Sequence, residues 1–384
     1  MNLRDYHHHE TLCPLPWSGF YLAPNGDVAN CSISQKILGN INQLPIEDIL
    51  MGIENQQIKQ DLAQGIKTPA CDNCWTFEQL NPNSSPTEGS NRKHFKTALA
   101  RSVINIVDDT ARFSLKQVDL RWRNTCNLAC VYCGPDLSST WAHELGETHT
   151  IDEAALESLK DYIVKHIKQL DYVYLCGGEP LLMKENLELI SLIKAQNPNV
   201  FIRVNTNLTN INSPIYRELV ACDNVHWIIS VESTESIFEF VRYGAKWTSW
   251  LANLKQLQQD VGHRHKISFN MVWCSLTSQN IFESFDLFLK LGFHPNSFIV
   301  QPLQDPPELD VNLLSKELKQ SLVAEIALRL QTADSKTWLY KSLENMRGHV
   351  NLTEYDQQPL VDFVAELDRR RGTNGLKLFD HLLK

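Results

Sequence analysis

The sequence lacks the features that would mark an exported or membrane-bound protein. No stretch approaches the roughly 18 consecutive apolar residues of a transmembrane helix, and the opening MNLRDYHHHETLC has no apolar signal-peptide core. Positive charge is not in excess either, because 36 Lys and Arg face 45 Asp and Glu, giving a formal net charge of −9. We therefore expect a cytoplasmic protein with no membrane partner. We do not expect a nucleic-acid partner, because phosphate contacts dominate such binding.

The composition also excludes a disordered chain and a disulfide scaffold. Of the 384 residues, 43% are hydrophobic and 21% are charged, as in ordinary globular proteins, and the length suggests two or three domains. Cysteine is plentiful, with ten residues: Cys13, Cys31, Cys71, Cys74, Cys126, Cys130, Cys133, Cys176, Cys222 and Cys274. Disulfide scaffolds are short, whereas this chain is long and its cysteines are clustered. Ligation of a metal or an iron–sulfur cluster explains them better.

Short apolar runs alternate with helical patterns in the middle of the chain. Six runs predict strands: Val118–Trp122, Tyr172–Cys176, Val200–Val204, His226–Val231, Ile267–Trp273 and Ser297–Val300. Between the first two, Thr150 and Glu153 predict a capping box that begins an amphipathic helix. Such alternation predicts right-handed βαβ units and a parallel sheet. Six units fall short of the eight in a closed barrel, so we expect an α/β fold with a partial (β/α)6 barrel.

The segments on either side do not share this alternation. Pro24-Asn25-Gly26-Asp27 predicts a hairpin turn, and the polar stretch Asn81–Asn91 predicts a loop or domain boundary. Residues 315–384 carry mostly helical patterns. We divide the chain into an N-terminal cysteine-bearing domain (1–80), a boundary segment (81–115), the barrel (116–302) and a helical C-terminal extension (303–384).

Three cysteines follow the first barrel strand in the pattern Cys126-x3-Cys130-x2-Cys133. A straight strand or helix cannot direct all three thiols to one metal, but a loop can wrap them around one side of a cluster. Three ligands on a four-iron cluster leave one iron open, as a catalytic site needs. A zinc site or three incidental core cysteines are the alternatives.

This motif, with the aromatic Tyr132 before its last cysteine, resembles the signature of the radical S-adenosylmethionine (SAM) superfamily. The resemblance implies that Cys126, Cys130 and Cys133 hold a [4Fe–4S] cluster whose fourth iron binds SAM. It also implies reductive cleavage of SAM to a 5′-deoxyadenosyl radical that abstracts a hydrogen atom. The partial barrel expected from the repeat count is the fold of that superfamily.

Other segments resemble the SAM-binding motifs of the same superfamily. Gly177-Gly178-Glu179-Pro180 is similar to a motif that contacts the methionyl amino group. Ser230 and Arg242 resemble the serine and arginine that hold the SAM carboxylate in the sulfatase-maturase-like branch, and an arginine fork suits a carboxylate. A surface arginine on a helix is the simpler alternative. Two positions depart from that branch and are expected as ribose or substrate contacts: Glu232, where Asp is usual, and Asn207, whose neighbour Leu208 replaces a glycine.

The N-terminal cysteines Cys13, Cys31, Cys71 and Cys74 form a second set. With the segments around them they resemble the twitch domain, a shorter relative of the SPASM domain, which implies an auxiliary [4Fe–4S] cluster. A structural zinc site would use the same four ligands. The order of domains, and the segment that continues from Cys133 to Trp141, resemble a group of stand-alone twitch-domain radical SAM proteins.

We therefore expect a radical SAM enzyme with two clusters and a flavodoxin- or ferredoxin-type electron donor. Its substrate would be a peptide or protein side chain, or a small sugar-like or amino-acid-like metabolite. The auxiliary cluster would aid a two-electron oxidation or a crosslink. Peptide maturases often carry a leader-binding winged-helix domain, and only twelve residues precede Cys13, which lowers the expectation of a leader peptide without removing it. The rival hypotheses are a metabolite dehydrogenase or epimerase of the same superfamily, a non-catalytic electron carrier and a nucleic-acid-modifying enzyme. Cys176, Cys222 and Cys274 are expected to be buried, unreactive thiols.

Overall fold

The computed structural model describes residues 3–80, 90–148, 151–303 and 305–383. The chain forms two compact units. The first comprises residues 1–125, 135–204 and 212–225, and the second comprises residues 126–134, 205–211 and 226–384. No helix within the described ranges has both the length and the apolar character needed to cross a bilayer.

The strands of the first unit run in the order β3-β2-β1-β4-β5-β6. Their bounds are β1 Gly19–Leu22, β2 Asp27–Ala29, β3 Gly39–Asn40, β4 Gln117–Leu120, β5 Tyr172–Leu175 and β6 Phe201–Thr206. The pairs from β1 through β4 and β5 to β6 are parallel, whereas β1, β2 and β3 pair antiparallel. The predicted hairpin turn lies between β1 and β2, and Gly26 takes a φ of +91°, which favours glycine. Because β1 pairs with β4, the N-terminal segment extends the sheet of the barrel strands.

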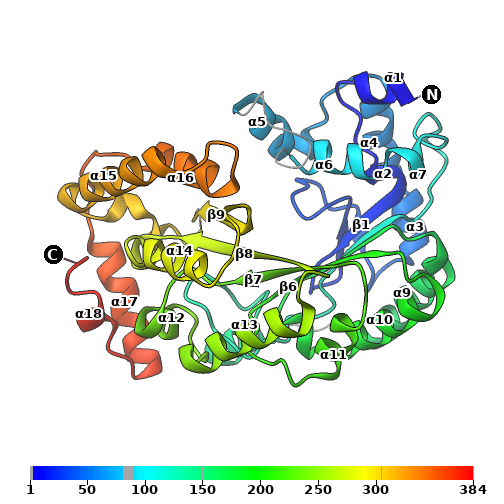
Figure 1. The fold of residues 1–384 in the computed structure, drawn as a ribbon. Helices are drawn as coiled ribbons and strands as arrows, with labels where there is room; N and C mark the ends of the chain where they lie inside the picture. The colour runs from blue at the N-terminus through cyan, green and yellow to red at the C-terminus, as the bar shows by residue number, and fades with distance from the viewer. Residues whose placement is uncertain (1–2, 81–89, 149–150, 304, 384) are drawn as a thin grey trace. The chain divides into compact units, whose positions relative to one another are not determined.

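The strands of this unit have one apolar and one polar face. Val118 and Leu120 of β4 are fully buried, and Trp122 continues the same alternation and donates its Nε1–H to Asn186 of α10. This apolar face is therefore the one that packs under the helices, and Figure 1 shows α9, α10 and α11 along one side of these strands. The first unit contains these helices: α1 Leu3–His8, α2 Leu15–Ser18, α3 Ile46–Met51, α4 Ile53–Ala63, α5 Asp72–Leu80, α6 Asn91–Ala98, α7 Ala100–Val103, α8 Ser139–Leu145, α9 Glu153–His166, α10 Lys184–Gln196 and α11 Pro214–Val220.

The second unit holds three parallel strands in the order β7-β8-β9, with bounds β7 Val225–Ser230, β8 Lys266–Trp273 and β9 Phe298–Pro302. Its helices are α12 Glu235–Val241, α13 Trp247–Val261, α14 Asn280–Lys290, α15 Lys316–Thr332, α16 Trp338–His349, α17 Gln358–Arg371 and α18 Gly375–Leu378. The C-terminal helices are not a detached tail, because Ser342 of α16 accepts a hydrogen bond from the backbone N–H of Val300 in β9 (3.2 Å).

The predicted α/β class is confirmed, since β4 to β9 match the six expected strands to within two residues at each end and helices follow them. The helix α9 does not begin at the predicted capping box. Asp152 is the N-cap of α9, because its side chain accepts the N–H of Ala154, while Thr150 lies outside the described residues. Residues 81–89 of the expected boundary loop also lie outside them, and Asn91 begins α6. The four-part division of the chain stays a prediction.

Candidate functional site

The loop that carries Cys126, Cys130 and Cys133 is held to the end of α12 by backbone hydrogen bonds. Ala129 N–H donates to the carbonyl of Tyr243 (2.9 Å), and Val131 N–H donates to that of Val241 (2.8 Å). Gly244, with a φ of +103°, allows the segment after α12 to approach the cysteine loop closely. A Cβ at this position would lie only 3.0 Å from the Asn127 carbonyl oxygen. The segment after α12 therefore fixes the shape of the cysteine loop.

Two N–H groups point at sulfur atoms of this loop. Arg242 Nη1 lies 3.7 Å from Cys130 Sγ, and Asn207 Nδ2 lies 4.0 Å from Cys126 Sγ. Burial raises the pKa of the Cys130 thiol, Arg242 opposes that rise, and the neighbouring Cys133 and Cys126 add to it. Three mutually close thiols with N–H donors to their sulfurs fit a [4Fe–4S] cluster, whose properties depend on such hydrogen bonds.

Arg242 and Glu232 form a buried ion pair beside this loop. Arg242 Nη2 lies 2.6 Å from Glu232 Oε2, and the two side chains are 5% and 0% exposed. Tyr132 donates its hydroxyl to Glu232 Oε1 (2.8 Å), and burial together with the charge of Glu232 raises the pKa of Tyr132 even though Arg242 lowers it. Arg242 Nε is buried and has no hydrogen-bond partner. Tyr132, Glu232 and Arg242, which the sequence marked separately, thus form one hydrogen-bonded network. The Nε–H of Arg242 is the donor that this network leaves for a ligand.

Ser230 and Asn207 lie in the same unit and have separate partners. Ser230 Oγ lies 3.3 Å from Asn205 Oδ1, at the ends of β7 and β6. The Asn207 carbonyl accepts the Nε1–H of Trp250 (2.9 Å). Leu208 follows with a φ of +57°, the left-handed conformation that a glycine would adopt without strain. The glycine-like backbone of this segment is therefore kept although the glycine is replaced.

The turn Gly177–Pro180 lies in the first unit, and its glycines are required by the neighbouring backbone. A Cβ on Gly178 would lie 2.1 Å from the Thr125 carbonyl oxygen, and one on Gly177 would lie 2.6 Å from Arg121 Cβ. Glu179 donates its N–H to the same Thr125 carbonyl (2.7 Å), and its carboxylate accepts the Leu181 N–H. The turn therefore braces Thr125, the residue that precedes Cys126.

The four N-terminal cysteines come together, since Cys13, Cys31, Cys71 and Cys74 line one cavity with Arg92. Burial and the mutual repulsion of these sulfurs raise the pKa of Cys13. Burial, and to a lesser extent repulsion from the Cys74 sulfur, raise the pKa of Cys31 to about 12. Within the described parts of the chain, no group of three or more His, Cys, Asp or Glu side chains is arranged to hold a single metal ion. Four thiols around one cavity could hold an iron–sulfur cluster or the zinc ion considered above.

The remaining cysteines are buried, as expected. Cys176, Cys222 and Cys274 are 9%, 8% and 0% exposed. Burial raises the pKa of Cys222 and of Cys274 to about 11.

Sequence reasoning missed a row of polar side chains across the first unit. The strand register aligns Tyr21 of β1 with Asp119 of β4, Tyr174 of β5 and Arg203 of β6. These positions alternate with the buried apolar ones, so they lie on the opposite face of the sheet. The signal was present in the sequence as polar residues set between valines and leucines, as in Val118-Asp119-Leu120-Arg121.

Comparison with known proteins identifies two regions of the chain. Residues 122–295 match the radical SAM superfamily, and residues 13–75 match SPASM, an iron–sulfur cluster-binding domain. No curated protein matches the chain.

Three solved structures align with parts of the chain. Native anSMEcpe with bound AdoMet is 16% identical with a TM-score of 0.43, and the alignment covers 56% of this chain and 60% of that chain. Streptococcus suis SuiB bound to S-adenosylmethionine is 12% identical with a TM-score of 0.44, covering 74% and 60%. SuiB bound to precursor peptide SuiA is 12% identical with a TM-score of 0.43, covering 73% and 64%. In all three, the chain spans less than two thirds of the other protein's length.

Proposed function

We propose that this chain, whose residues 122–295 match the radical SAM superfamily and whose residues 13–75 match SPASM, reductively cleaves SAM to abstract a hydrogen atom from its substrate. The superfamily implies an enzyme that uses SAM and a [4Fe–4S] cluster, and the SPASM region implies a further iron–sulfur cluster. When bound, the catalytic cluster supplies the electron that breaks SAM into methionine and the 5′-deoxyadenosyl radical. The substrate is a peptide or protein side chain or a small metabolite.

The observation that carries this proposal is the pair of N–H donors at the cysteine loop. Arg242 and Asn207 direct N–H groups to the sulfurs of Cys130 and Cys126, which fits thiolates in a cluster better than protonated core thiols. We assign the catalytic cluster to Cys126, Cys130 and Cys133. The proposed SAM contacts are those inferred from the sequence: Tyr132, Gly177, Gly178, Glu179, Pro180, Asn207, Ser230, Glu232 and Arg242.

The second cluster is assigned to Cys13, Cys31, Cys71 and Cys74, which line one cavity. A cluster near the substrate can take up the electron that a substrate radical releases, so the overall reaction would be a two-electron oxidation or a crosslink. A flavodoxin- or ferredoxin-type protein would supply electrons to the catalytic cluster.

Iron analysis and SAM cleavage test these assignments together. After anaerobic reconstitution we expect about eight irons per chain, four for each cluster. Cys130→Ala should retain about four irons and form no 5′-deoxyadenosine from SAM under reducing conditions. Cys222→Ala, a buried cysteine outside both sets, is the control and should behave as the wild type. SAM cleavage by Cys130→Ala would overturn the catalytic assignment, and a chain with two clusters that never cleaves SAM would instead be an electron carrier.

A further inference from the structure

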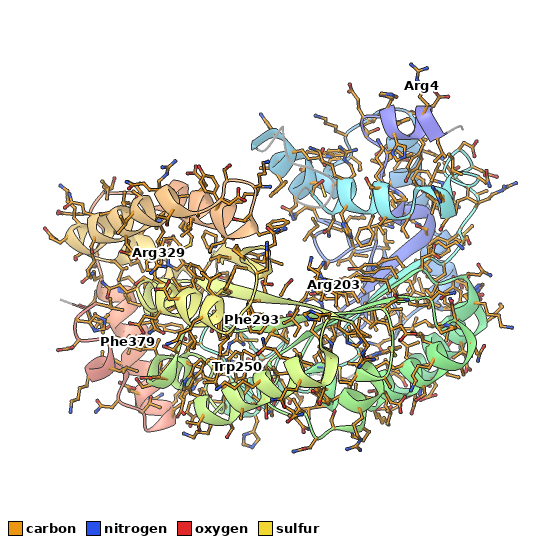
Figure 2. All side chains as sticks on the ribbon, viewed as in Figure 1. Arg4, Arg203, Trp250, Phe293, Arg329 and Phe379 are labelled. Atoms are coloured by element: carbon orange, nitrogen blue, oxygen red, sulfur yellow. The ribbon has the colours of Figure 1, made fainter. Side chains whose placement is uncertain are left out.

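Two arginines stand on the polar face of the sheet in the first unit. Arg203 of β6 lies in the row with Tyr21, Asp119 and Tyr174, and Arg121 follows Asp119 by two positions and so shares its face. Figure 2 labels Arg203 on the side of the sheet opposite to α10 and α11. Both arginine side chains remain partly exposed although the strands around them are buried.

The surrounding aromatic rings orient these guanidinium groups but carry no charge that would neutralise them. Arg121 Cζ lies 4.9 Å from the centroid of the Tyr21 ring, and Arg203 Cζ lies 5.3 Å from that of Tyr174. Arg203 also hydrogen-bonds the Tyr172 side chain. Stacking on aromatic rings fixes the plane of a guanidinium and leaves its N–H edge available to an oxyanion.

Asp119 is the one carboxylate in this row, and the side chain of Arg121 hydrogen-bonds it and forms an ion pair with it. The ion pair joins Arg121 Nε to Asp119 Oδ1 at 3.8 Å, and neither of these two atoms has a hydrogen-bond partner. Arg203 Nε is likewise buried without a partner. Two arginines against one aspartate leave an excess positive charge on a largely buried face, which is costly unless an anion from outside completes the site.

The same cluster lies close to the auxiliary cysteines. Asp119 accepts a hydrogen bond from the side chain of Ser32, which follows Cys31. Cys176, directly after β5, lies close enough to Arg121 to interact with it electrostatically, as Asp119 does. A ligand held by the arginines would therefore lie near the proposed auxiliary cluster, where a substrate radical could pass on its electron.

We propose that Arg121 and Arg203 bind an anionic oxygen group of the substrate, a carboxylate or a phosphate, on the polar face of β1, β4, β5 and β6. The role of that anion as part of the substrate rests on the proposed function, whereas the binding of the anion does not. The substrate class is thus narrowed to acidic peptides and to acidic or phosphorylated metabolites.

Isothermal titration calorimetry of the cluster-loaded full chain tests the proposal with two probes, N-acetyl-L-glutamate for a carboxylate and inorganic phosphate. Saturating SAM is present throughout, without reductant. Bound SAM occupies the proposed site at Arg242, so the heat measured does not come from a probe that binds there. We expect saturable binding of at least one probe to the wild type. Arg121→Gln and Arg203→Gln should each weaken it at least tenfold, and Arg101→Gln, which changes an exposed arginine on α7, should leave it unchanged.

The two probes distinguish the sources of the anion, since preference for phosphate indicates a phosphorylated metabolite and preference for the carboxylate an acidic side chain or terminus. Arg121→Lys and Arg203→Lys, which keep the charge but lose the fork, should bind more weakly than the wild type and guard against misfolding of the glutamine variants. Absence of saturable binding by the wild type, or glutamine variants that bind as well as it does, would overturn the proposal. Because no reduction is involved, failure of SAM cleavage would not affect this result.

Discussion

Arg242 and Glu232 are joined by a 2.6 Å contact between Nη2 and Oε2, while the other end of the same guanidinium reaches the sulfur of Cys130. The pair links the end of α12 to the segment after β7 and to the cysteine loop. Its carboxylate also accepts the hydroxyl of Tyr132. One arginine therefore connects the structural core of the second unit with the proposed catalytic cluster.

Removing one member of this pair should destabilise the protein more than removing both. Arg242→Leu leaves Glu232 charged and buried, so we expect the free energy of unfolding to fall by about 3–5 kcal/mol. The double variant Arg242→Leu/Glu232→Leu should lose less, because no unpaired charge remains. Anaerobic denaturant unfolding measures both. Lys246→Leu, which breaks an exposed pair with Glu239, is the control and should cost at most about 1 kcal/mol. Equal losses in the single and double variants would contradict the prediction.

Gly178→Ala should displace the start of the cysteine loop. The new Cβ would meet the Thr125 carbonyl oxygen at 2.1 Å, and this backbone atom cannot yield without moving Cys126, the next residue. We expect the iron content to fall from about eight to about four per chain, with loss of SAM cleavage. Gly134→Ala is a matched control, because no atom lies within 4 Å of a Cβ at that glycine beside Cys133. Full iron content in Gly178→Ala would show that the turn does not position the loop.

Leu208 should tolerate glycine better than alanine. Its side chain is fully buried, so either truncation loses about 2–5 kcal/mol of packing. Only glycine relieves the strain of the φ of +57°, which costs on the order of 1 kcal/mol for other residues. Leu208→Gly should therefore unfold at a higher denaturant concentration than Leu208→Ala, the reverse of the usual order. A less stable glycine variant would refute the strained conformation.

Lys59 should make stability depend on pH. Its Nζ donates to the carbonyls of Thr110 and Arg112, and burial lowers its pKa to about 8, although Asp109 raises it. Between about pH 8 and the ordinary lysine pKa near 10.4, the unfolded chain therefore binds more protons than the folded one. Stability then rises with pH by up to about 1.4 kcal/mol per pH unit.

Unfolding of the wild type and Lys59→Met from pH 7.5 to pH 10 tests this sign. The free-energy difference, wild type minus variant, should increase with pH above about 8, because the cost of the buried charge disappears only in the wild type. Lys36→Met, at a half-exposed lysine paired with Glu54, should show no such trend. A difference that is flat or falls with pH would mean that the Lys59 amine keeps its ordinary pKa.

Local patterns were enough to predict the architecture and the cofactors. Alternation of apolar residues and helical spacing are properties of neighbouring residues, so six strands and the parallel α/β class were predicted correctly. Cys126, Cys130 and Cys133 lie within eight residues of one another, so a single loop can bring the three thiols together. The cysteine motifs therefore pointed to the superfamily that residues 122–295 match and to the cluster-binding domain that residues 13–75 match.

Contacts between distant residues were decided by the tertiary structure alone. The sequence marked Glu232 and Arg242 as separate ligand contacts, and only folding brings them into one ion pair with Tyr132. It marked Gly178 as part of a motif that resembles a SAM contact, but not as the residue that packs against the carbonyl oxygen of Thr125. The row of Tyr21, Asp119, Tyr174 and Arg203 depends on the register of four strands, which hydrogen bonds across the sheet determine. The sequence by itself thus pointed to the cofactors through the spacing of its cysteines, whereas the strand register, set by hydrogen bonds across the sheet, decided which polar side chains stand together.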